Sequence, residues 1–554
     1  MKKITQYSLG IISGLILGLS FPPFPFYWIA FIGFIPFLYV LLTKEKGFFW
    51  FSYLTFFIYH GITAWWIGSW QPVDESSQIW LRIAGVAVWL VHPFFFCIPI
   101  VVFKTIKDKL SSNFAIWSFP FLWISFEWLH SLSDIAFPWL TIGYTQTYNY
   151  LWVQFADVFG VWGLSFLIIL VNVLILKIIL ITIKYNDKIK LLKFLFYDKK
   201  LTIYLLIVVL IIIIPVIYGA VRIKEYDHSK LLETKKIITI GIIQPNINPW
   251  EKWQSRSNVI RQIQKHFYLQ DSLIRSVNKI DLFIWSETAI PNFSDAFNIM
   301  HDFSILANNV NANNVSILTG FADIELLTNS KNIPAVAQKY WDNPNIYYVA
   351  YNAALLINPN NEAKPKQIYH KMKLTPFSER IPYVELFSFL IPVLDWGVGI
   401  SNWEKGENQA TLHFEKEGKE ADIGVIICIE SIYPNFVANF ASLGANLLVI
   451  ITNDGWYDNT FGPEQHYCIG RMRAIETRRY IARCANTGIS GFITPTGKST
   501  KIAPVQVPIG LYSEIPLIEK KSIYTLLGDV LPIIALIFSI IIMIYSFIYK
   551  RNKQ

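Results

Sequence analysis

Eight apolar stretches, each long enough to approach the thickness of a lipid bilayer as a helix, constrain this chain more than any other feature. A helix needs about 20 apolar residues to cross the hydrocarbon core. The stretches are Tyr7 to Phe24, Phe26 to Leu42, Phe48 to Trp70, Ile79 to Phe103, Phe114 to Leu132, Phe159 to Ile183, Leu201 to Ala220 and Ile523 to Tyr549. The hydrophobic content of 53% is also too high for a soluble protein. The sequence therefore predicts a membrane protein with an eight-helix transmembrane bundle.

The first stretch has two possible interpretations. Lys2 and Lys3 precede it, as basic residues precede the apolar core of a signal peptide. Pro22, Pro23 and Pro25, however, stand where a cleavage site with small residues would be needed. We therefore expect this stretch to be retained as a membrane helix.

The basic residues predict the orientation of the bundle, because cytoplasmic connections are enriched in lysine and arginine. They occupy alternate connections, with Arg82 as the exception among the others. The clusters are Lys2/Lys3, Lys44/Lys46, Lys104/Lys107/Lys109, the run from Lys184 to Lys200, and Lys550/Arg551/Lys553. Placing them in the cytoplasm leaves the segment from Arg222 to Lys521 outside. The net charge of +9 then reflects topology, and we expect no nucleic-acid partner.

This orientation divides the chain into three regions. Residues 1–221 form a seven-helix membrane domain, residues 222–521 an extracytoplasmic domain, and residues 522–554 a last membrane helix with a cytoplasmic tail. The segments Glu225 to Lys236 and Pro504 to Glu519 are the expected linkers into and out of the middle region.

The four cysteines do not form a disulfide framework. Cys97 lies in an apolar stretch, so Cys428, Cys468 and Cys484 leave an odd number in the outer region. At least one outer thiol must be free. A bridge between Cys468 and Cys484 is disfavoured, because both are predicted to lie in one helix and its exit.

The outer region has the pattern of an α/β domain. Its short apolar runs are rich in β-branched residues and alternate with longer helix-compatible stretches such as Ser257 to Val277. The runs are Ile237 to Ile243, Leu282 to Trp285, Val315 to Thr319, Val349 to Ile357, Ile423 to Ile429 and Leu447 to Thr452. Continuous apolar strands of this kind are buried on both faces, so layered helices and sheets are expected.

Polar side chains appear where two of these runs end. Glu287 follows the run that ends at Trp285, whereas Cys428 and Glu430 follow the run that begins at Ile423. Open α/β folds gather their functional sites at the carboxyl ends of strands. Each residue alone would be read as a surface charge or a packed thiol, but their shared placement predicts a site.

The chemistry of these residues is that of a cysteine nucleophile. Such a nucleophile needs a base to form the thiolate and a donor that stabilises the oxyanion. Glu287 and Cys428 supply the base and the thiol, and a loop-like segment from Tyr369 to Glu379 supplies Lys371 and a further acid, Glu379. The three roles are filled without a histidine.

These residues and their surroundings resemble known families over essentially the whole chain. The order Glu287, Lys371, Cys428 resembles the nitrilase (carbon–nitrogen hydrolase) superfamily, and its fusion to a membrane bundle resembles the apolipoprotein N-acyltransferase family. The further motifs are Phe137-Pro-Trp-Leu, Gly143-Tyr-Thr-Gln146, the segment from Gln244 to Trp253, Asn453-Asp-Gly-Trp456, His466, Arg471 to Glu476, and Asn486-Thr-Gly488.

The resemblance implies a nitrilase-like α-β-β-α sandwich and a two-step acyl transfer at the periplasmic face of a bacterial inner membrane. Cys428 takes an acyl chain from a phospholipid such as phosphatidylethanolamine, and the N-terminal amine of an S-diacylglyceryl-cysteine lipoprotein then accepts it. Glu287 is the implied general base and Lys371 the oxyanion donor. Glu379 and Glu430 are implied second acids, and Trp253 and Trp456 line the lipid access. We expect a monomer.

Four positions depart from the pattern of the family. Ile429 stands where an aromatic residue commonly follows the nucleophile. Lys373 stands where histidine is common, Ser378 where glycine is common, and Arg380 where tyrosine or phenylalanine is common. These departures leave the three catalytic positions intact but bear on acyl-chain and head-group preference.

The remaining predictions concern ionisable residues outside this set. Glu127, His130 and Asp134 lie in or near the fifth apolar stretch, and helical spacing favours pairing between Glu127 and His130. The histidines His370, His413 and His466 are scattered, so we expect no metal and no cofactor. Two alternatives remain: a membrane-tethered amidase with the same catalytic residues, and a transporter with an inactive domain, which the presence of acid, lysine and thiol disfavours.

Overall fold

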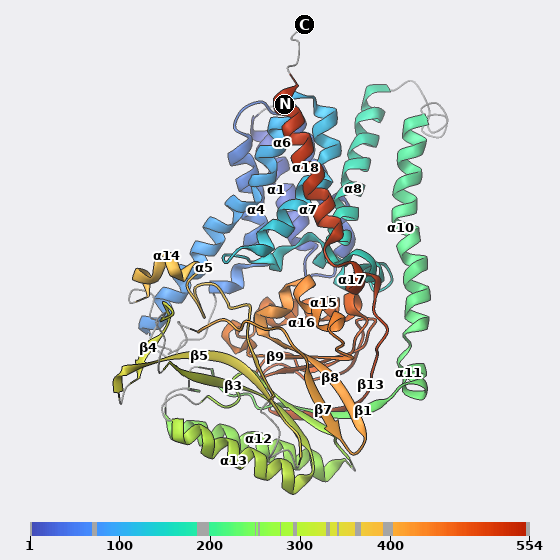
Figure 1. Cartoon of the computed structure of the whole chain (residues 1–554). Helices are drawn as coiled ribbons and strands as arrows, with labels where there is room; N and C mark the ends of the chain where they lie inside the picture. The colour runs from blue at the N-terminus through green and yellow to red at the C-terminus, as the bar shows by residue number, and fades with distance from the viewer. Residues whose placement is uncertain are drawn as a thin grey trace.

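A helical bundle carries a two-sheet α/β domain at one of its ends (Figure 1). The computed structural model describes residues 3–68, 75–185, 199–249, 251–252, 255–277, 279–291, 296–327, 333–340, 343–359, 367–391 and 403–549.

Helices account for most of the eight apolar stretches. They are α1 (Lys3–Leu19), α2 (Ala30–Gly33), α3 (Ile35–Thr43), α4 (Phe48–Thr63), α5 (Glu75–Phe96), α6 (Ile98–Lys109), α7 (Ser112–Leu132), α8 (Ala156–Tyr185), α10 (Lys199–Glu225), α17 (Ile523–Leu527) and α18 (Val530–Ile548). Among the residues that the structure describes, four helical segments are long and apolar enough to cross a membrane: Gly85–Lys109, Trp152–Ile183, Lys199–Thr234 and Val530–Ile548. Two shorter apolar segments are Ile4–Leu19 and Tyr27–Thr43. The chain is thus rich in apolar helices, and the count of eight spans stays a prediction.

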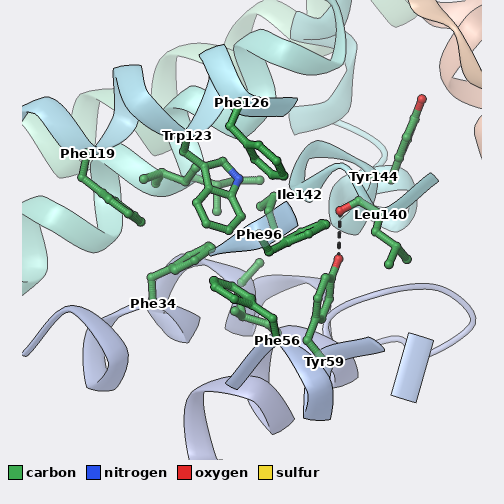
Figure 2. Close-up of a cluster of buried hydrophobic side chains, with 14 of the residues drawn as sticks. Phe34, Phe56, Tyr59, Phe96, Phe119, Trp123, Phe126, Leu140, Ile142 and Tyr144 are labelled. Atoms are coloured by element: carbon green, nitrogen blue, oxygen red, sulfur yellow. Dashed lines mark hydrogen bonds between the residues drawn. The ribbon is translucent and has the colours of Figure 1, made fainter. Parts of the chain in front are cut away.

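Aromatic side chains fill the core of the bundle (Figure 2). The Trp123 ring packs edge-on against Phe34, with 4.8 Å between centroids, and tilted against Phe56 at 5.5 Å. The Tyr59 hydroxyl donates to the Leu140 carbonyl over 3.0 Å. Large rings with offset contacts bury much area per residue, so this cluster fixes the positions of the helices around it.

The bundle carries basic residues of several connections at the end away from the α/β domain. Helix α1 begins and α18 ends there (Figure 1). The Lys107 ammonium donates to the carbonyl oxygens of Leu41 and Lys44, and Lys44 donates to Gln6. Basic clusters that are separate in sequence therefore share one end of the bundle.

Two sheets form the centre of the α/β domain. The first has the order β13-β1-β2-β3-β5-β4, with β6 also paired to β5. Its strands are β1 (Ile237–Gln244), β2 (Leu282–Trp285), β3 (Ser316–Leu327), β4 (Gln338–Tyr340), β5 (Asn343–Ile357), β6 (Gln367–His370) and β13 (Ile509–Pro516). Strands β1, β2 and β3 are parallel, and β13 pairs antiparallel with β1 from Ile237↔Pro516 to Gln244↔Ile509.

The second sheet has the order β12-β11-β10-β9-β8-β7. Its strands are β7 (Leu412–Lys416), β8 (Lys419–Ile427), β9 (Leu447–Thr452), β10 (Ile481–Ala485), β11 (Gly491–Ile493) and β12 (Ser499–Ile502). Strands β8, β9 and β10 are parallel. Side chains from both sheets, such as Leu282 and Val425, share one buried core. The two sheets therefore pack face to face.

Helices cover both outer faces of the paired sheets. Helices α12 (Arg256–Ser276) and α13 (Ala296–Asn313) pack on the first sheet, and α15 (Pro434–Ser442) and α16 (Phe461–Thr477) lie on the second, toward the bundle (Figure 1). Two short helices complete the domain, α11 (His228–Thr234) and α14 (Val384–Phe387). The α-β-β-α layering expected from the sequence is confirmed. Each of the six apolar runs overlaps a strand, but Cys428 and Ile429 at the end of one run belong to a 3-10 turn.

The expected linker from Pro504 to Glu519 is wrong. This segment contains β13, which hydrogen-bonds along the whole of β1 and closes one edge of the first sheet. The other expected linker, Glu225 to Lys236, contains helix α11. Both segments carry prolines or charges, but several of their apolar residues are buried: Tyr226, Leu231, Ile515, Leu517 and Ile518.

Two further expectations are also wrong. Cys484 lies in strand β10 and not at the exit of the helix that contains Cys468, and all four cysteines are free thiols. Glu127 does not pair with His130: its carboxylate accepts from the Trp123 indole over 2.9 Å and from the Ile142 amide over 2.8 Å. The Ile142 amide, in the connection after α7, is the donor that Glu127 binds in place of His130 one turn along the helix.

Candidate active site

Cys428 lies at a sharp turn directly after strand β8. It begins a 3-10 turn over Cys428–Ile432, and its backbone is left-handed, with φ of +51°. A residue with a Cβ loses roughly 1–2 kcal/mol in this conformation. The surrounding structure must hold the turn, because a cysteine does not adopt it by preference. The thiol is thus placed at the carboxyl end of a buried parallel strand.

Glu287 and Lys371 come from the first sheet and meet in the interior. Glu287 follows β2 by two residues, and Lys371 follows β6, where its amide donates to the Asn352 carbonyl over 2.8 Å. The Lys371 ammonium lies 3.1 Å from Glu287 Oε1 and 2.8 Å from Glu379 Oε1. All three side chains are buried. The structure therefore brings together three of the predicted site residues as one ion-pair network.

Asn352 completes this network and was not predicted. Its side-chain amide donates to Glu287 Oε1 over 2.8 Å and to Glu379 Oε1 over 2.9 Å. The residue lies in β5, within an otherwise apolar run. A single amide side chain in a buried strand needs hydrogen-bond partners. Its presence in an apolar run is therefore the sequence feature from which a role in the site could have been predicted.

The charges in this network set the state of the thiol. Burial by itself lowers the pKa of Lys371. The carboxylates of Glu287 and Glu379 outweigh this effect and raise the pKa well above its ordinary value. Burial opposes ionisation of Glu379, but Lys371 holds the pKa of this carboxyl below its ordinary value. Burial, together with the negative charge of Glu287, raises the pKa of the Cys428 thiol, and Lys371 only partly offsets this. At neutral pH the resting cysteine is a thiol that needs a base.

Glu430 lies near the ion-pair network and joins two segments of the site. Its Oε1 accepts from the Tyr369 hydroxyl and the Met372 amide, both over 2.7 Å, and its Oε2 accepts from the Ile427 amide over 2.8 Å. Burial raises the pKa of this carboxyl to about 7. Glu430 therefore ties the lysine segment to the end of β8, while Glu379 contacts Lys371 itself.

A chain of buried polar side chains contacts the 3-10 turn Cys428–Ile432, which we call the nucleophile turn. The Ser431 hydroxyl lies 2.8 Å from both His466 Nε2 and the Cys428 carbonyl oxygen. His466 Nδ1 donates to Asp454 over 2.8 Å, and Asp454 also accepts from Arg483 over 2.7 Å. Burial lowers the pKa of His466, so the ring is neutral. The roles of Ser431, Asp454 and Arg483 were not predicted, because no local pattern links residues this far apart.

Of the two tryptophans expected at the lipid access, only Trp456 is among the described residues. Trp456 lies in a 3-10 turn over Asp454–Tyr457, two residues after Asp454, which binds His466, and is partly buried. Trp253 lies outside the described residues. The neighbouring Lys252 is buried, and its ammonium donates to the Glu287 carbonyl over 2.9 Å and to Thr288 over 2.8 Å.

The nucleophile turn packs directly on the membrane bundle. Ile429 and Ile432 belong to the same buried cluster as the aromatic core of the bundle. The Tyr144 hydroxyl, from the connection between α7 and α8, donates to the Ile432 carbonyl over 3.2 Å. A residue that packs in this cluster must be apolar, which is compatible with isoleucine at position 429.

Among the described residues, no three His, Cys, Asp or Glu side chains are grouped as ligands of one metal ion. What the site contains is a buried acid, a charged lysine and a thiol at the ends of strands in a four-layer domain. These features define an enzyme of the carbon–nitrogen hydrolase class joined to a membrane bundle.

Comparison with known proteins identifies the family. Residues 239–511 match the carbon–nitrogen hydrolase family, and residues 13–174 match the apolipoprotein N-acyltransferase N-terminal domain. The apolipoprotein N-acyltransferase of Chlorobaculum tepidum is 32% identical over 98% of this chain and 97% of its own length. Apolipoprotein N-acyltransferase 1 of Treponema denticola is 27% identical over the same shares, 98% and 97%. The chain belongs to the apolipoprotein N-acyltransferase family, which confirms the resemblance stated from the sequence.

A solved structure with a related domain also aligns. It is Saccharomyces cerevisiae Nit3, a member of branch 10 of the nitrilase superfamily. The alignment covers 53% of this chain and 95% of that chain, with a TM-score of 0.35 and 14% sequence identity.

Proposed function

We propose that this protein transfers a fatty acyl chain from a membrane phospholipid to the N-terminal amine of S-diacylglyceryl-cysteine in lipoproteins, through a thioester on Cys428. The observation that carries the proposal is the packing of the nucleophile turn. Ile429 and Ile432 are buried in the aromatic core of the apolar bundle, next to the thiol. A soluble amide substrate does not require this arrangement, whereas a lipid ester must be reached from the membrane.

The first step forms the acyl-enzyme. Glu287 accepts the Cys428 proton, and the sulfur attacks the carbonyl carbon of the donor ester. The Lys371 ammonium stabilises the oxyanion of the tetrahedral intermediate. The ester C–O bond then breaks, and Glu287 returns the proton to the departing lysophospholipid. Phosphatidylethanolamine, a common bacterial phospholipid, is the proposed donor.

The second step transfers the acyl chain. The acceptor amine attacks the thioester carbon, and Glu287 takes the proton released by the amine. The C–S bond then breaks, and Glu287 returns this proton to the departing sulfur, which restores the thiol. Because the lysophospholipid leaves before the amine reacts with the acyl-enzyme, the reaction is a ping-pong cycle. The lipoprotein substrate is exported, so the catalytic domain faces the periplasm and the bundle lies in the inner membrane.

Intact-mass measurement tests the proposal. Purified enzyme incubated with phosphatidylethanolamine should gain the mass of one acyl group, and a diacylglyceryl-cysteine peptide should discharge it as an N-acyl amide. Cys428→Ala should form no adduct. Cys468→Ala and Cys484→Ala serve as controls, because these buried thiols lie outside the ion-pair network, and both should keep most of the activity.

Three results would contradict the proposal. The first is steady release of free fatty acid without an adduct, which indicates a hydrolase. The second is deamination of small amides by an enzyme that does not react with phospholipid. The third is near-normal transfer by Cys428→Ala, which would remove this cysteine from the mechanism.

A further inference from the structure

A basic pocket lies where the bundle meets the lysine segment, outside the ion-pair network of the active site. It encloses about 130 Å³. Leu132 and Asp134 line it from the end of α7, Lys373, Arg380 and Lys405 from the catalytic domain, and Tyr433 from the residues after the nucleophile turn. We call this cavity the basic pocket.

Two of its three cations already have carboxylate partners. Lys405 Nζ lies 3.0 Å from Asp134, and the Arg380 guanidinium lies 2.8 Å from Glu404 and 3.0 Å from Glu385. These pairs neutralise most of the charge around the cavity. They also fix the walls, because the Lys405–Asp134 pair joins the catalytic domain to the end of α7.

Lys373 is the cation in the basic pocket whose ammonium has no ion pair or hydrogen bond to the described residues. Its Nζ lies 5.4 Å from the centroid of the Tyr433 ring. Burial lowers the pKa of this lysine, and the nearby charge of Lys405 lowers it further. A half-buried charge without a partner is costly, and an anion in the cavity would compensate it.

The position of Lys373 relative to the thiol is fixed by Glu430. The same Glu430 carboxylate accepts from the Lys373 amide over 3.2 Å and from the Ile427 amide over 2.8 Å, one residue before Cys428. Tyr433 directly follows the nucleophile turn. The exposed side chain of Leu132 provides an apolar rim on the bundle side.

We propose that the basic pocket binds the phosphodiester group of a glycerophospholipid acyl donor, with Lys373 as the principal hydrogen-bond donor. This inference rests on the proposed function. In such a lipid only the glycerol unit separates the phosphate from the acyl esters, so an anion held beside the nucleophile turn places an ester near Cys428. Lysine binds phosphate as a point charge. Lys405, which is paired with Asp134, also lines the pocket.

The test compares two acyl donors on three variants. Phosphatidylethanolamine carries the phosphodiester, whereas p-nitrophenyl palmitate has an acyl ester and no phosphate. For Lys373→Met we expect kcat/KM of Cys428 acylation to fall about tenfold to a hundredfold with phosphatidylethanolamine, as for loss of a charge-assisted hydrogen bond. The rate with the neutral ester should stay unchanged. Lys373→Arg should recover most of the loss.

Lys416→Met is the matched control. Lys416 is also a largely buried lysine of the catalytic domain, and it donates to the Ile280 carbonyl near the start of β8, at the strand end opposite to Cys428. Lys416→Met should leave kcat/KM of Cys428 acylation unchanged with both donors. An equal loss with both donors in Lys373→Met would mean that Lys373 acts through the nucleophile turn, and no loss with either would mean that the basic pocket does not bind the donor. Either result overturns the inference.

A binding measurement separates this inference from the proposed function. Calorimetric titration of Cys428→Ala protein with sn-glycero-3-phosphoethanolamine should show binding that Lys373→Met removes, even if no acyl-enzyme ever forms. Absence of binding would contradict the inference that the basic pocket binds the phosphodiester. It would not contradict the thioester mechanism. Inorganic phosphate bound as tightly as the glycerophosphodiester would exclude a head-group site.

Discussion

At the scale of single residues, the arrangement around Lys371 explains how a buried thiol can react without a histidine. One ammonium faces two carboxylates, so the resting network carries net negative charge and keeps Cys428 protonated. Transfer of the proton to Glu287 removes one of these negative charges and creates the thiolate beside Lys371. The charge of the network is therefore redistributed and not increased, which lowers the cost of ionisation in a buried site.

Substitutions of the base and the donor should both prevent accumulation of the acyl-enzyme. General-base catalysis contributes about 10²–10⁴-fold and an oxyanion donor roughly 10²–10³-fold. Glu287→Gln and Lys371→Met should slow Cys428 acylation by factors in these ranges. Time-resolved intact mass with phospholipid measures the rate, and thermal unfolding verifies that the variants are folded.

Glu417→Gln is the control for this pair, because Glu417 is an exposed carboxylate that binds Lys279 and Asn314 far from the thiol. Its acylation rate should equal that of the unmodified enzyme. A normal rate in Glu287→Gln or in Lys371→Met would exclude that residue from the mechanism.

The sequence predicted the residues whose chemistry is visible locally, and the structure adds those that act through contacts distant in sequence. Glu287 and Cys428 could be proposed because each follows an apolar strand. Asn352 and the pair Asp454–His466 could not be assigned in this way, because their partners come from other strands and helices. Their placement depends on how the two sheets pack.

At the scale of elements, strand β3 is packed unusually close to the segment that carries Glu287. A Cβ atom on Gly320 would lie 2.5 Å from the Thr288 amide nitrogen and 2.7 Å from Glu287 Cα. Both atoms belong to the backbone and cannot move aside as a flexible side chain can. The close approach of β3 therefore fixes where the Glu287 carboxylate lies relative to Lys371.

Gly320→Ala should displace Glu287 and impair acylation more than folding. Overpacking of this kind costs roughly 1–3 kcal/mol, and a displacement of about 1 Å at a reacting group can cost about 10²-fold in rate. We expect at least a tenfold lower rate of Cys428 acylation, measured by intact mass, with the variant still folded in detergent.

Gly510→Ala on strand β13 of the same sheet provides the comparison. Its added Cβ would meet Leu273 Cδ2 at 3.4 Å, which is ordinary van der Waals contact. This variant should retain activity. Equal activity of the two variants would show that the contact of β3 does not position Glu287.

The elements themselves were predictable to different degrees. Five of the six apolar runs lie in the parallel strands β1, β2, β3, β8 and β9, and buried parallel strands are continuous apolar segments. The sixth run lies in β5, which is antiparallel to its neighbours. Strand β13 was missed because its Ile509–Pro516 sequence mixes polar and apolar residues and is only half-buried, as suits an edge strand. Turn residues around such a strand resemble those of a linker.

At the scale of the whole molecule, the bundle and the catalytic domain are joined by buried polar contacts. The Arg478 guanidinium of the catalytic domain lies 2.8 Å from Asp157 in α8, and Arg222 in α10 binds the same carboxylate over 2.7 Å. Gln465 in α16 accepts from the indoles of Trp66 and Trp139. Removing one partner of such a buried pair leaves an uncompensated charge, so relative movement of the two parts is restricted here.

The number of membrane spans could not be settled by hydropathy. Several apolar helices, such as α2 and α3, are short and are interrupted at Phe34, where the Phe34 amide donates to Asn172 of α8 over 2.8 Å. Hydropathy gives the length of each apolar stretch, but tertiary contacts determine where each helix ends. The shared end of the basic clusters is the observation that bears on orientation.

Orientation predicts which exposed positions react with a membrane-impermeant thiol reagent. All four native cysteines are buried and should give little background. A cysteine at Ala312, exposed near the end of α13, should be labelled in cells whose outer membrane has been permeabilised, because the catalytic domain is proposed to face the periplasm. A cysteine at Lys46, exposed between α3 and α4 at the other end of the bundle, should react only after the inner membrane is opened. Labelling of Lys46→Cys but not Ala312→Cys in intact inner membranes would place the catalytic domain in the cytoplasm, where exported lipoproteins could not reach Cys428.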